Sequence, residues 1–179
     1  PELSLQTGQL TSVRQTAERA TEGVDLSGKT ALVTGVNSGI GQETMRILAM
    51  RGARVMGTAR TLEKASEACA GVAGDTTPIA CELTDLDSIR ACAQHVDRQT
   101  PVVDIVVANA GIMALPKLEQ VRGIEKQFAT NHLGHFLLLT SVIDKLTERS
   151  RVAVVSSAAH MQAPAVGIDF DNLSSERAY

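Results

Sequence analysis

Aromatic residues are scarce in this chain of 179 residues, which contains three Phe, one Tyr and no Trp. A core must therefore be built from Val, Ile, Leu, Ala and Met, and a hydrophobic content of 44% is enough for one. Small aliphatic residues of this kind suit a parallel sheet covered by helices. The same composition excludes an intrinsically disordered chain.

Long apolar runs and blocks of like charge are also missing. No run approaches the ~20 residues that cross a bilayer, so we expect no membrane span. The formal net charge is −3, and no cluster of Lys and Arg stands out. Nothing favours nucleic acid or an anionic membrane surface, and we expect a small-molecule partner.

Cysteines are few, and their spacing is uninformative for metal or disulfide chemistry. Cys69, Cys81 and Cys92 form an odd set without C-x-x-C spacing. The chain opens with polar residues instead of a charged and then apolar leader. These features predict a reducing, cytoplasmic location.

From residue 29 onward, short apolar runs alternate with amphipathic stretches. The runs predict five strands, at 31–33, 55–56, 78–80, 102–107 and 152–155, and the amphipathic stretches predict helices at about 39–51, 61–70, 85–98 and 120–146. This alternation is typical of the α/β class, a Rossmann-type doubly wound parallel sheet with helices on both faces. Ligands of such sheets bind beyond the carboxyl ends of the strands.

Residues 1–27 form an extension in front of the domain predicted at 28–179. Within it, Leu10, Val13, Ala17 and Ala20 fall near a helical period. We expect a short helix that lies against the domain.

A glycine-rich turn follows the first predicted strand and reads Thr34-Gly35-Val36-Asn37-Ser38-Gly39-Ile40-Gly41. Glycine permits a tight turn and lets backbone N–H groups approach a pyrophosphate, and a helix N-terminus favours the anion. Such glycines could equally make only a compact turn. The strand before them and the helix after them favour a dinucleotide site.

The spacing T-G-x-x-x-G-I-G resembles the cofactor turn of the short-chain dehydrogenase/reductase family, and the resemblance extends over about residues 28–179. Asn109-Ala110-Gly111 is similar to the N-A-G segment of that family, which lies close to the cofactor. Residues 131–136 resemble its catalytic helix, and Ser156-Ser157 its catalytic serine segment. Several of these phrases are most similar to the retinol-dehydrogenase-like branch.

The resemblance implies two catalytic residues. Ser157, favoured over Ser156 by spacing, would hydrogen-bond the substrate oxygen, and Asn131 would hold a water in a proton relay. Without the family, Asn131 would be interpreted as structural. The implied cofactor contacts are Gly35, Asn37, Ser38, Gly39, Ile40, Gly41, Arg60, Glu82, Leu83, Asn109, Ala110 and Gly111.

The end of the second strand bears on the choice of cofactor. An NAD-preferring site usually has an acidic residue there, but this chain reads Thr58-Ala59-Arg60. Arg60 offers a bidentate fork to a 2′-phosphate, so NADP is the predicted cofactor and NAD the alternative. Arg60 could instead be a solvated charge at the start of a helix.

The family's general acid/base is a Tyr in a Y-x-x-x-K pattern, in which the Lys lowers a pKa that is ordinarily near ~10. The one Tyr is Tyr179, the last residue, and the segment before it resembles one upstream of the catalytic Tyr. We therefore expect a fold truncated after the fifth strand, with the Tyr/Lys pair in the missing part of a longer parent.

The leading functional hypothesis is an NADP(H)-dependent oxidoreductase that interconverts an alcohol and a ketone or aldehyde. The resemblance to the retinol-dehydrogenase-like branch implies an apolar substrate. The alternative is a catalytically inactive dinucleotide-binding or redox-sensing protein without the Tyr/Lys pair. A homo-oligomer is compatible with either. His132 and His135 have a spacing that suits a metal, but they lack carboxylate or Cys partners, so no metal is expected.

Overall fold

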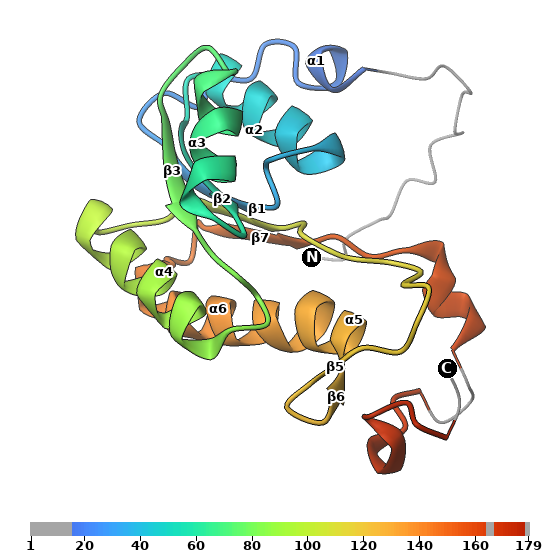
Figure 1. Cartoon of the computed structure of the whole chain (residues 1–179). Helices are drawn as coiled ribbons and strands as arrows, with labels where there is room; N and C mark the ends of the chain where they lie inside the picture. The colour runs from blue at the N-terminus through green and yellow to red at the C-terminus, as the bar shows by residue number, and fades with distance from the viewer. Residues whose placement is uncertain (1–15, 164–166, 178–179) are drawn as a thin grey trace, which may run out of the picture.

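The computed structural model describes residues 16–163 and 167–177, and its centre is a five-stranded sheet (Figure 1). The strands are β1 (Thr30–Thr34), β2 (Arg54–Ala59), β3 (Thr76–Ala80), β4 (Ile105–Ala108) and β7 (Arg151–Val154). They lie in the order β3-β2-β1-β4-β7, and every neighbouring pair is parallel. The five predicted strands and the doubly wound parallel sheet are confirmed.

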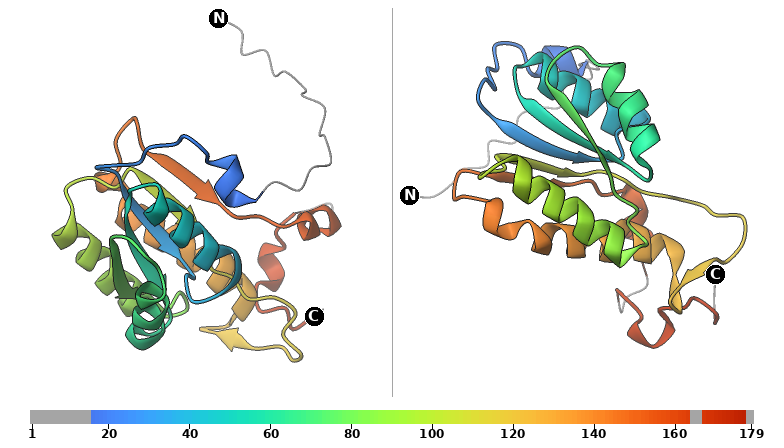
Figure 2. Two further views of the ribbon diagram at one scale, coloured as in Figure 1. Left: turned by 90° about the horizontal axis from the view of Figure 1, so that it is seen from above. Right: turned by 60° about the vertical axis from the view of Figure 1, so that its left-hand side comes forward.

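Helices cover both faces of this sheet (Figure 2). On one face lie α2 (Gly39–Met50) and α3 (Leu62–Ala70), and on the other lie α4 (Leu86–Gln99) and α6 (His135–Ser141). Successive side chains of a strand point to opposite faces. In β1, Val33 therefore packs into the core beneath α2 and α3, while Leu32 packs into the core beneath α4 and α6.

The stretch predicted as one helix at 120–146 is divided into several elements. These are β5 (Gln120–Val121), β6 (Ile124–Glu125), α5 (Lys126–Phe128), the π-helix η1 (Ala129–Gly134), α6 and the 3₁₀ helix η2 (Ile143–Lys145). The prediction is wrong for 120–125, which form an antiparallel hairpin. Arg122 and Gly123 both have positive φ, +54° and +77°, and two such residues make the tight turn of a two-residue hairpin.

The N-terminal extension contains one described helix, α1 (Ala17–Ala20), which lies against α2. The contact is polar. The Glu18 carboxylate accepts a hydrogen bond from Arg46 at 2.7 Å, and the Glu18 carbonyl accepts one from Arg51 at 2.7 Å. Leu10 and Val13 lie outside the described residues, and the division between 1–27 and 28–179 stays a prediction.

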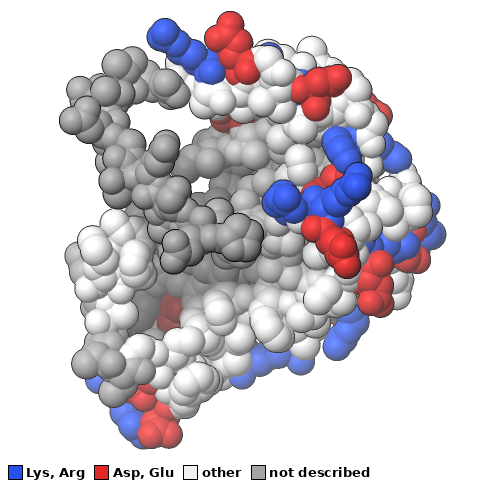
Figure 3. Space-filling model, turned by 180° about the vertical axis from the view of Figure 1, so that it is seen from behind, with Lys and Arg blue, Asp and Glu red and all other residues white. Residues whose placement is uncertain are grey.

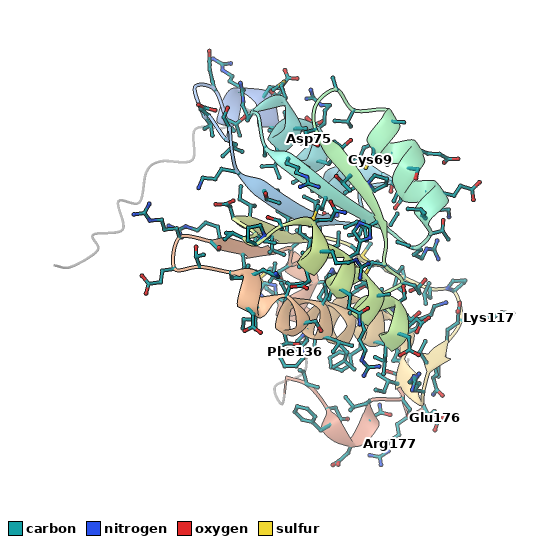
Figure 4. All side chains as sticks on the ribbon, turned by 90° about the vertical axis from the view of Figure 1, so that its left-hand side faces the viewer. Cys69, Asp75, Lys117, Phe136, Glu176 and Arg177 are labelled. Atoms are coloured by element: carbon teal, nitrogen blue, oxygen red, sulfur yellow. The ribbon has the colours of Figure 1, made fainter. Side chains whose placement is uncertain are left out.

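The last described segment, 167–177, packs on the β5–β6 hairpin. Gln120 donates to the Ser174 carbonyl at 2.9 Å and to the Glu176 carboxylate at 3.1 Å, and Figure 4 shows Glu176 beside the hairpin. The segment includes the 3₁₀ turn η4 (Phe170–Asn172), and another 3₁₀ turn, η3 (Ala158–Gln162), follows β7. Within the described ranges, no helix has the length and apolar character needed to cross a membrane.

Candidate functional site

A cavity of about 420 Å³ opens at the carboxyl ends of the strands. The chain places β2 and β3 on one side of β1 and β4 on the other, so the direction of winding reverses between β1 and β4. Ligands of open α/β sheets bind in the crevice at such a reversal. The cavity is lined by Gly35, Asn37, Ser38, Gly39, Ile40, Thr58, Ala59, Arg60, Cys81, Glu82, Leu83, Asn109, Ala110, Gly111, Ile112 and Thr130.

The predicted cofactor contacts, with the exception of Gly41, are among these lining residues. Gly41 lies beneath the turn instead. A methyl group at Gly41 would overlap the Gly35 carbonyl oxygen and the Asn109 side-chain nitrogen. Gly35 has φ +72°, and its added Cβ would lie 2.8 Å from the Ala110 Cα. These two glycines allow direct contact between the turn and the loop after β4.

The N-terminus of α2 opens onto the cavity. Its N-cap residue, Ser38, makes no side-chain capping hydrogen bond, and no acidic residue stands in the first turn. By contrast, Thr61 and Asp85 cap α3 and α4 with their side chains. The first amides of α2 are therefore open to an anion, which the helix dipole also favours.

Thr34, at the end of β1, holds the loop that follows β4. Its hydroxyl oxygen accepts hydrogen bonds from the backbone amides of Asn109 and Ala110, each at 2.9 Å. The Asn109 side chain also donates to the Thr34 carbonyl at 2.9 Å. Thr34 was not among the predicted site residues. Its position as the first residue of the T-G-x-x-x-G-I-G motif is the signal that could have identified it.

Asn131, one of the two predicted catalytic residues, does not line the cavity but supports its wall. Its side-chain amide accepts from the Ile112 amide at 2.9 Å and donates to the Ile112 carbonyl at 2.8 Å. Its backbone carbonyl accepts a hydrogen bond from His135 Nδ1 at 2.9 Å. The role of Asn131 in a proton relay stays a prediction.

Ser157, the other predicted catalytic residue, lies just beyond β7 at the same edge of the sheet. Its hydroxyl oxygen accepts a hydrogen bond from the Ala159 amide at 3.2 Å and caps η3. Among the described residues the Ser157 hydroxyl makes no further hydrogen bond, so its proton is free to donate. The structure does not bring Ser157 into the cavity wall, so its role in substrate binding stays a prediction.

Among the described residues that line the cavity, Arg60 and Glu82 are the charged ones. The Glu82 carboxylate is turned back on its own loop, where it accepts from the Thr84 amide at 3.0 Å and the Thr84 hydroxyl at 2.9 Å. Arg60 is exposed and takes part in none of the ion pairs formed by the described residues. The wall therefore presents an unpaired cation at the end of β2.

Several lining residues were absent from the predicted set. Thr58, Ala59 and Cys81 are chain neighbours of predicted contacts, and Ile112 directly follows the N-A-G segment. Thr130 comes from η1, which follows the β5–β6 hairpin in the chain, and no local pattern marks it as a cavity residue. Its position in the wall follows from the tertiary packing of η1, in which Gly134 lies against the Leu83 backbone.

The two histidines with metal-like spacing have separate roles. His132 stacks on Phe128 with 5.1 Å between ring centroids, whereas His135 is buried and bonded to Thr34 and Asn131. In the part of the chain that the structure describes, no three His, Cys, Asp or Glu residues are grouped to hold a metal ion.

On the face in Figure 3, basic and acidic side chains are intermingled.

A protein-family model described as short chain dehydrogenase matches residues 29–168. Retinol dehydrogenase 13 of Homo sapiens is 40% identical over 156 residues, which cover 83% of this chain and 46% of that protein. Short-chain dehydrogenase TIC 32 B, chloroplastic, of Brassica napus is 35% identical over 176 residues, covering 92% of this chain and 55% of that protein. The chain spans about half the length of the curated relatives it matches.

Solved structures agree with this match. The structure of an uncharacterized Mycobacterium paratuberculosis protein has a TM-score of 0.78 and 34% identity, covering 89% of this chain and 56% of that one. The Pseudomonas aeruginosa RhlG/NADP active-site complex has a TM-score of 0.59 and 28% identity, covering 80% of this chain and 51% of that one. With the Rossmann-type sheet and its glycine turn, these matches show that the chain belongs to the short-chain dehydrogenase family of oxidoreductases and is retinol-dehydrogenase-like.

Proposed function

We propose that the cavity binds NADP(H) and that the protein serves the interconversion of an alcohol and a ketone or aldehyde. The observation that carries this proposal is the pairing of an uncapped helix N-terminus with an unpaired Arg60 on one cavity wall. A pyrophosphate fits the first and a 2′-phosphate fits the second. The RhlG/NADP complex, a structural neighbour, adds support by analogy.

The donor set of the wall suits a dinucleotide. The first amides of α2 suit the pyrophosphate, and the Arg60 guanidinium suits a phosphate by a bidentate, charge-assisted contact. The Glu82 carboxylate of the wall is engaged by Thr84, so its charge is partly satisfied by its own loop. When bound, the nicotinamide supplies or accepts the hydride of the reaction.

The chain's own residues supply binding and orientation. The Ser157 hydroxyl would donate a hydrogen bond to the oxygen of a carbonyl or alcohol, stabilising the charge that develops there. Asn131 would keep the Ile112 wall in place. Met113, which follows that wall, is 79% exposed and offers apolar surface, consistent with an apolar substrate.

Titration of the protein with NADPH and with NADH, followed by nicotinamide fluorescence, tests the proposal. We expect tighter binding of NADPH. The variant Arg60→Asp should lose about tenfold or more in NADPH affinity, since hydrogen bonds to charged groups contribute about 1.5–3 kcal/mol. The control Arg149→Asp makes the same charge change on an exposed residue outside the cavity and should bind as the wild type does.

Three outcomes would contradict parts of the proposal. Equal affinities for the two cofactors, unchanged in Arg60→Asp, would leave Arg60 as a solvated charge and remove the case for NADP. Binding of neither cofactor would overturn the dinucleotide site. Binding without turnover of any carbonyl compound by the protein would favour the inactive dinucleotide-binding or redox-sensing alternative. The cytoplasmic location and a homo-oligomeric state stay predictions.

A further inference from the structure

His135 is a buried titratable residue close to the candidate dinucleotide site. It stands at the first position of α6 and is 4% exposed. Its Nε2 lies 2.8 Å from the Thr34 hydroxyl oxygen, and its Nδ1 lies 2.9 Å from the Asn131 carbonyl oxygen. The imidazole therefore connects the end of β1 with η1, two segments about a hundred residues apart.

The partners of the ring determine its protonation. A carbonyl oxygen only accepts, so Nδ1 carries a proton and donates it to Asn131. The Thr34 hydroxyl already accepts from the amides of Asn109 and Ala110, which occupy its two lone pairs. Its own proton is donated to Nε2 at 2.8 Å, since the alternative acceptor, the Val107 carbonyl, is 3.5 Å away. The neutral ring protonated on Nδ1 satisfies every group.

A positively charged ring does not fit this arrangement. A second N–H, on Nε2, would point at a hydroxyl oxygen whose lone pairs are both occupied. Thr34 would then have to release Asn109 or Ala110, and both residues line the cavity. The neutral state of His135 and the position of this wall are thus linked.

The surroundings of the ring are uncharged. Thr34 on β1, Asn109 and Ala110 after β4, and Asn131 on η1 carry no charge, and within the described residues no carboxylate or cation acts on the ring. Burial lowers the pKa of His135, and the hydrogen bond to the Asn131 carbonyl opposes this only in part. The ring is therefore neutral near pH 7 and gains a proton only in more acidic solution.

We propose that His135 is a positioning residue of the dinucleotide site, whose neutral imidazole holds Thr34 and the Asn109–Ala110 wall and whose protonation weakens dinucleotide binding. This inference rests on the proposed function. It adds a residue that contacts neither cofactor nor substrate and that acts through Thr34.

The test is the dissociation constant for NADPH between about pH 5 and pH 8, the range in which a histidine titrates. We compare the wild type with His135→Asn and with the control His132→Asn, which removes an exposed histidine of the neighbouring turn. Below the pKa of the ring, wild-type affinity should fall by up to about tenfold for each unit of pH. His135→Asn should bind more weakly at pH 8 and lack this part of the pH dependence, whereas His132→Asn should follow the wild type. The phosphate of the ligand also titrates, but it does so equally in all three proteins.

A second measurement needs no variant and no ligand. The ¹⁵N shifts of the His135 ring in the wild-type protein should show the neutral form protonated on Nδ1 at pH 7. A ring protonated on Nε2, or charged at that pH, would overturn the network even if His135→Asn does not fold. Identical pH profiles for wild type and His135→Asn would overturn the inference and leave the proposed function intact. Failure of the wild type to bind NADPH at every pH would overturn both.

Discussion

The side-chain amide of Asn131 pairs with the backbone of Ile112, accepting from its N–H at 2.9 Å and donating to its carbonyl at 2.8 Å. The two residues are 19 positions apart, and the pair ties η1 to the cavity wall. A residue expected from its resemblance to act in proton transfer is thus engaged with the backbone through both polar atoms of its side chain.

The variant Asn131→Ala should therefore weaken NADPH binding and lower the free energy of unfolding by about 1 kcal/mol, because both hydrogen bonds to Ile112 are lost. Gln127→Ala is the matched control. It frees the Ala114 amide, two residues further along the same loop and outside the cavity wall. Titration calorimetry and urea unfolding measure the two effects. Equal loss of NADPH affinity in both variants would contradict a specific role for the Asn131–Ile112 pair.

Gly41→Ala should destabilise the protein and abolish dinucleotide binding. The added methyl group overlaps the Gly35 carbonyl and the Asn109 side chain, so α2 must move away from the turn. We expect a loss of about 1–3 kcal/mol in the free energy of unfolding. In the control Gly71→Ala, the new methyl meets only carbonyl oxygens at 3.6 and 3.7 Å, which is ordinary contact. A stable Gly41→Ala protein with wild-type NADPH affinity would refute the packing argument.

Asp104 should contribute stability that depends on pH. Partial burial raises the pKa of its carboxyl group, but hydrogen bonds from Lys29 and from the Thr30 amide, each 2.9 Å long, outweigh this and lower the pKa overall. A lowered pKa in the folded state stabilises the protein above the unfolded value of ~3.9, and this contribution disappears as the pH falls through the folded value.

The variant Asp104→Asn should cost about 1 kcal/mol at pH 7 and much less at the acid end, where the wild-type carboxyl is also neutral. The half-exposed Lys29 limits the size of the effect. Asp87→Asn, which breaks the more exposed pair with Arg90, should change stability little. Thermal unfolding between about pH 3 and pH 7 gives the comparison. A constant difference between Asp104→Asn and wild type at all pH values would show that the charge is unimportant.

The three thiols should be unreactive in the folded protein. Cys69, Cys81 and Cys92 are free and buried. A hydrogen bond with Cys81, together with burial, raises the pKa of Cys92, and burial raises that of Cys69. The thiolate is the reactive form, so native protein near pH 8 should react slowly with Ellman's reagent. Denatured protein should release three equivalents of the thionitrobenzoate anion, one for each thiol. Rapid reaction of the native thiols would show that the core around α3 and α4 opens easily.

Local patterns predicted most of the fold. Alternation of apolar runs with amphipathic stretches gave the five strands and the helices α2, α3 and α4, because burial on both faces requires continuous apolar strands. The helix predicted at 120–146 was wrong at 120–125. There, two residues with positive φ make the turn of a hairpin. Gly123 was a visible signal for a turn in the sequence. The positive φ of Arg122 was not, because the turn itself imposes it.

The glycine turn, the N-A-G segment and Arg60 were predictable as cavity residues, because each directly follows a strand and the carboxyl ends of parallel strands share one edge. Thr130 was not predictable in this way, since η1 reaches the cavity only through tertiary packing, with Gly134 against the Leu83 backbone. The paired contacts of Asn131 with Ile112, and of His135 with Thr34, also join segments that no local pattern relates.

The sequence by itself therefore determined the α/β class, the position of the glycine turn and the edge at which the site lies, since these depend on periodicity and on residues that are neighbours in the chain. Only the tertiary structure decided which polar side chains meet behind the cavity wall, and through them the protonation of His135. Hydrogen bonds act over about 3 Å, so their partners are known only once distant segments have packed together.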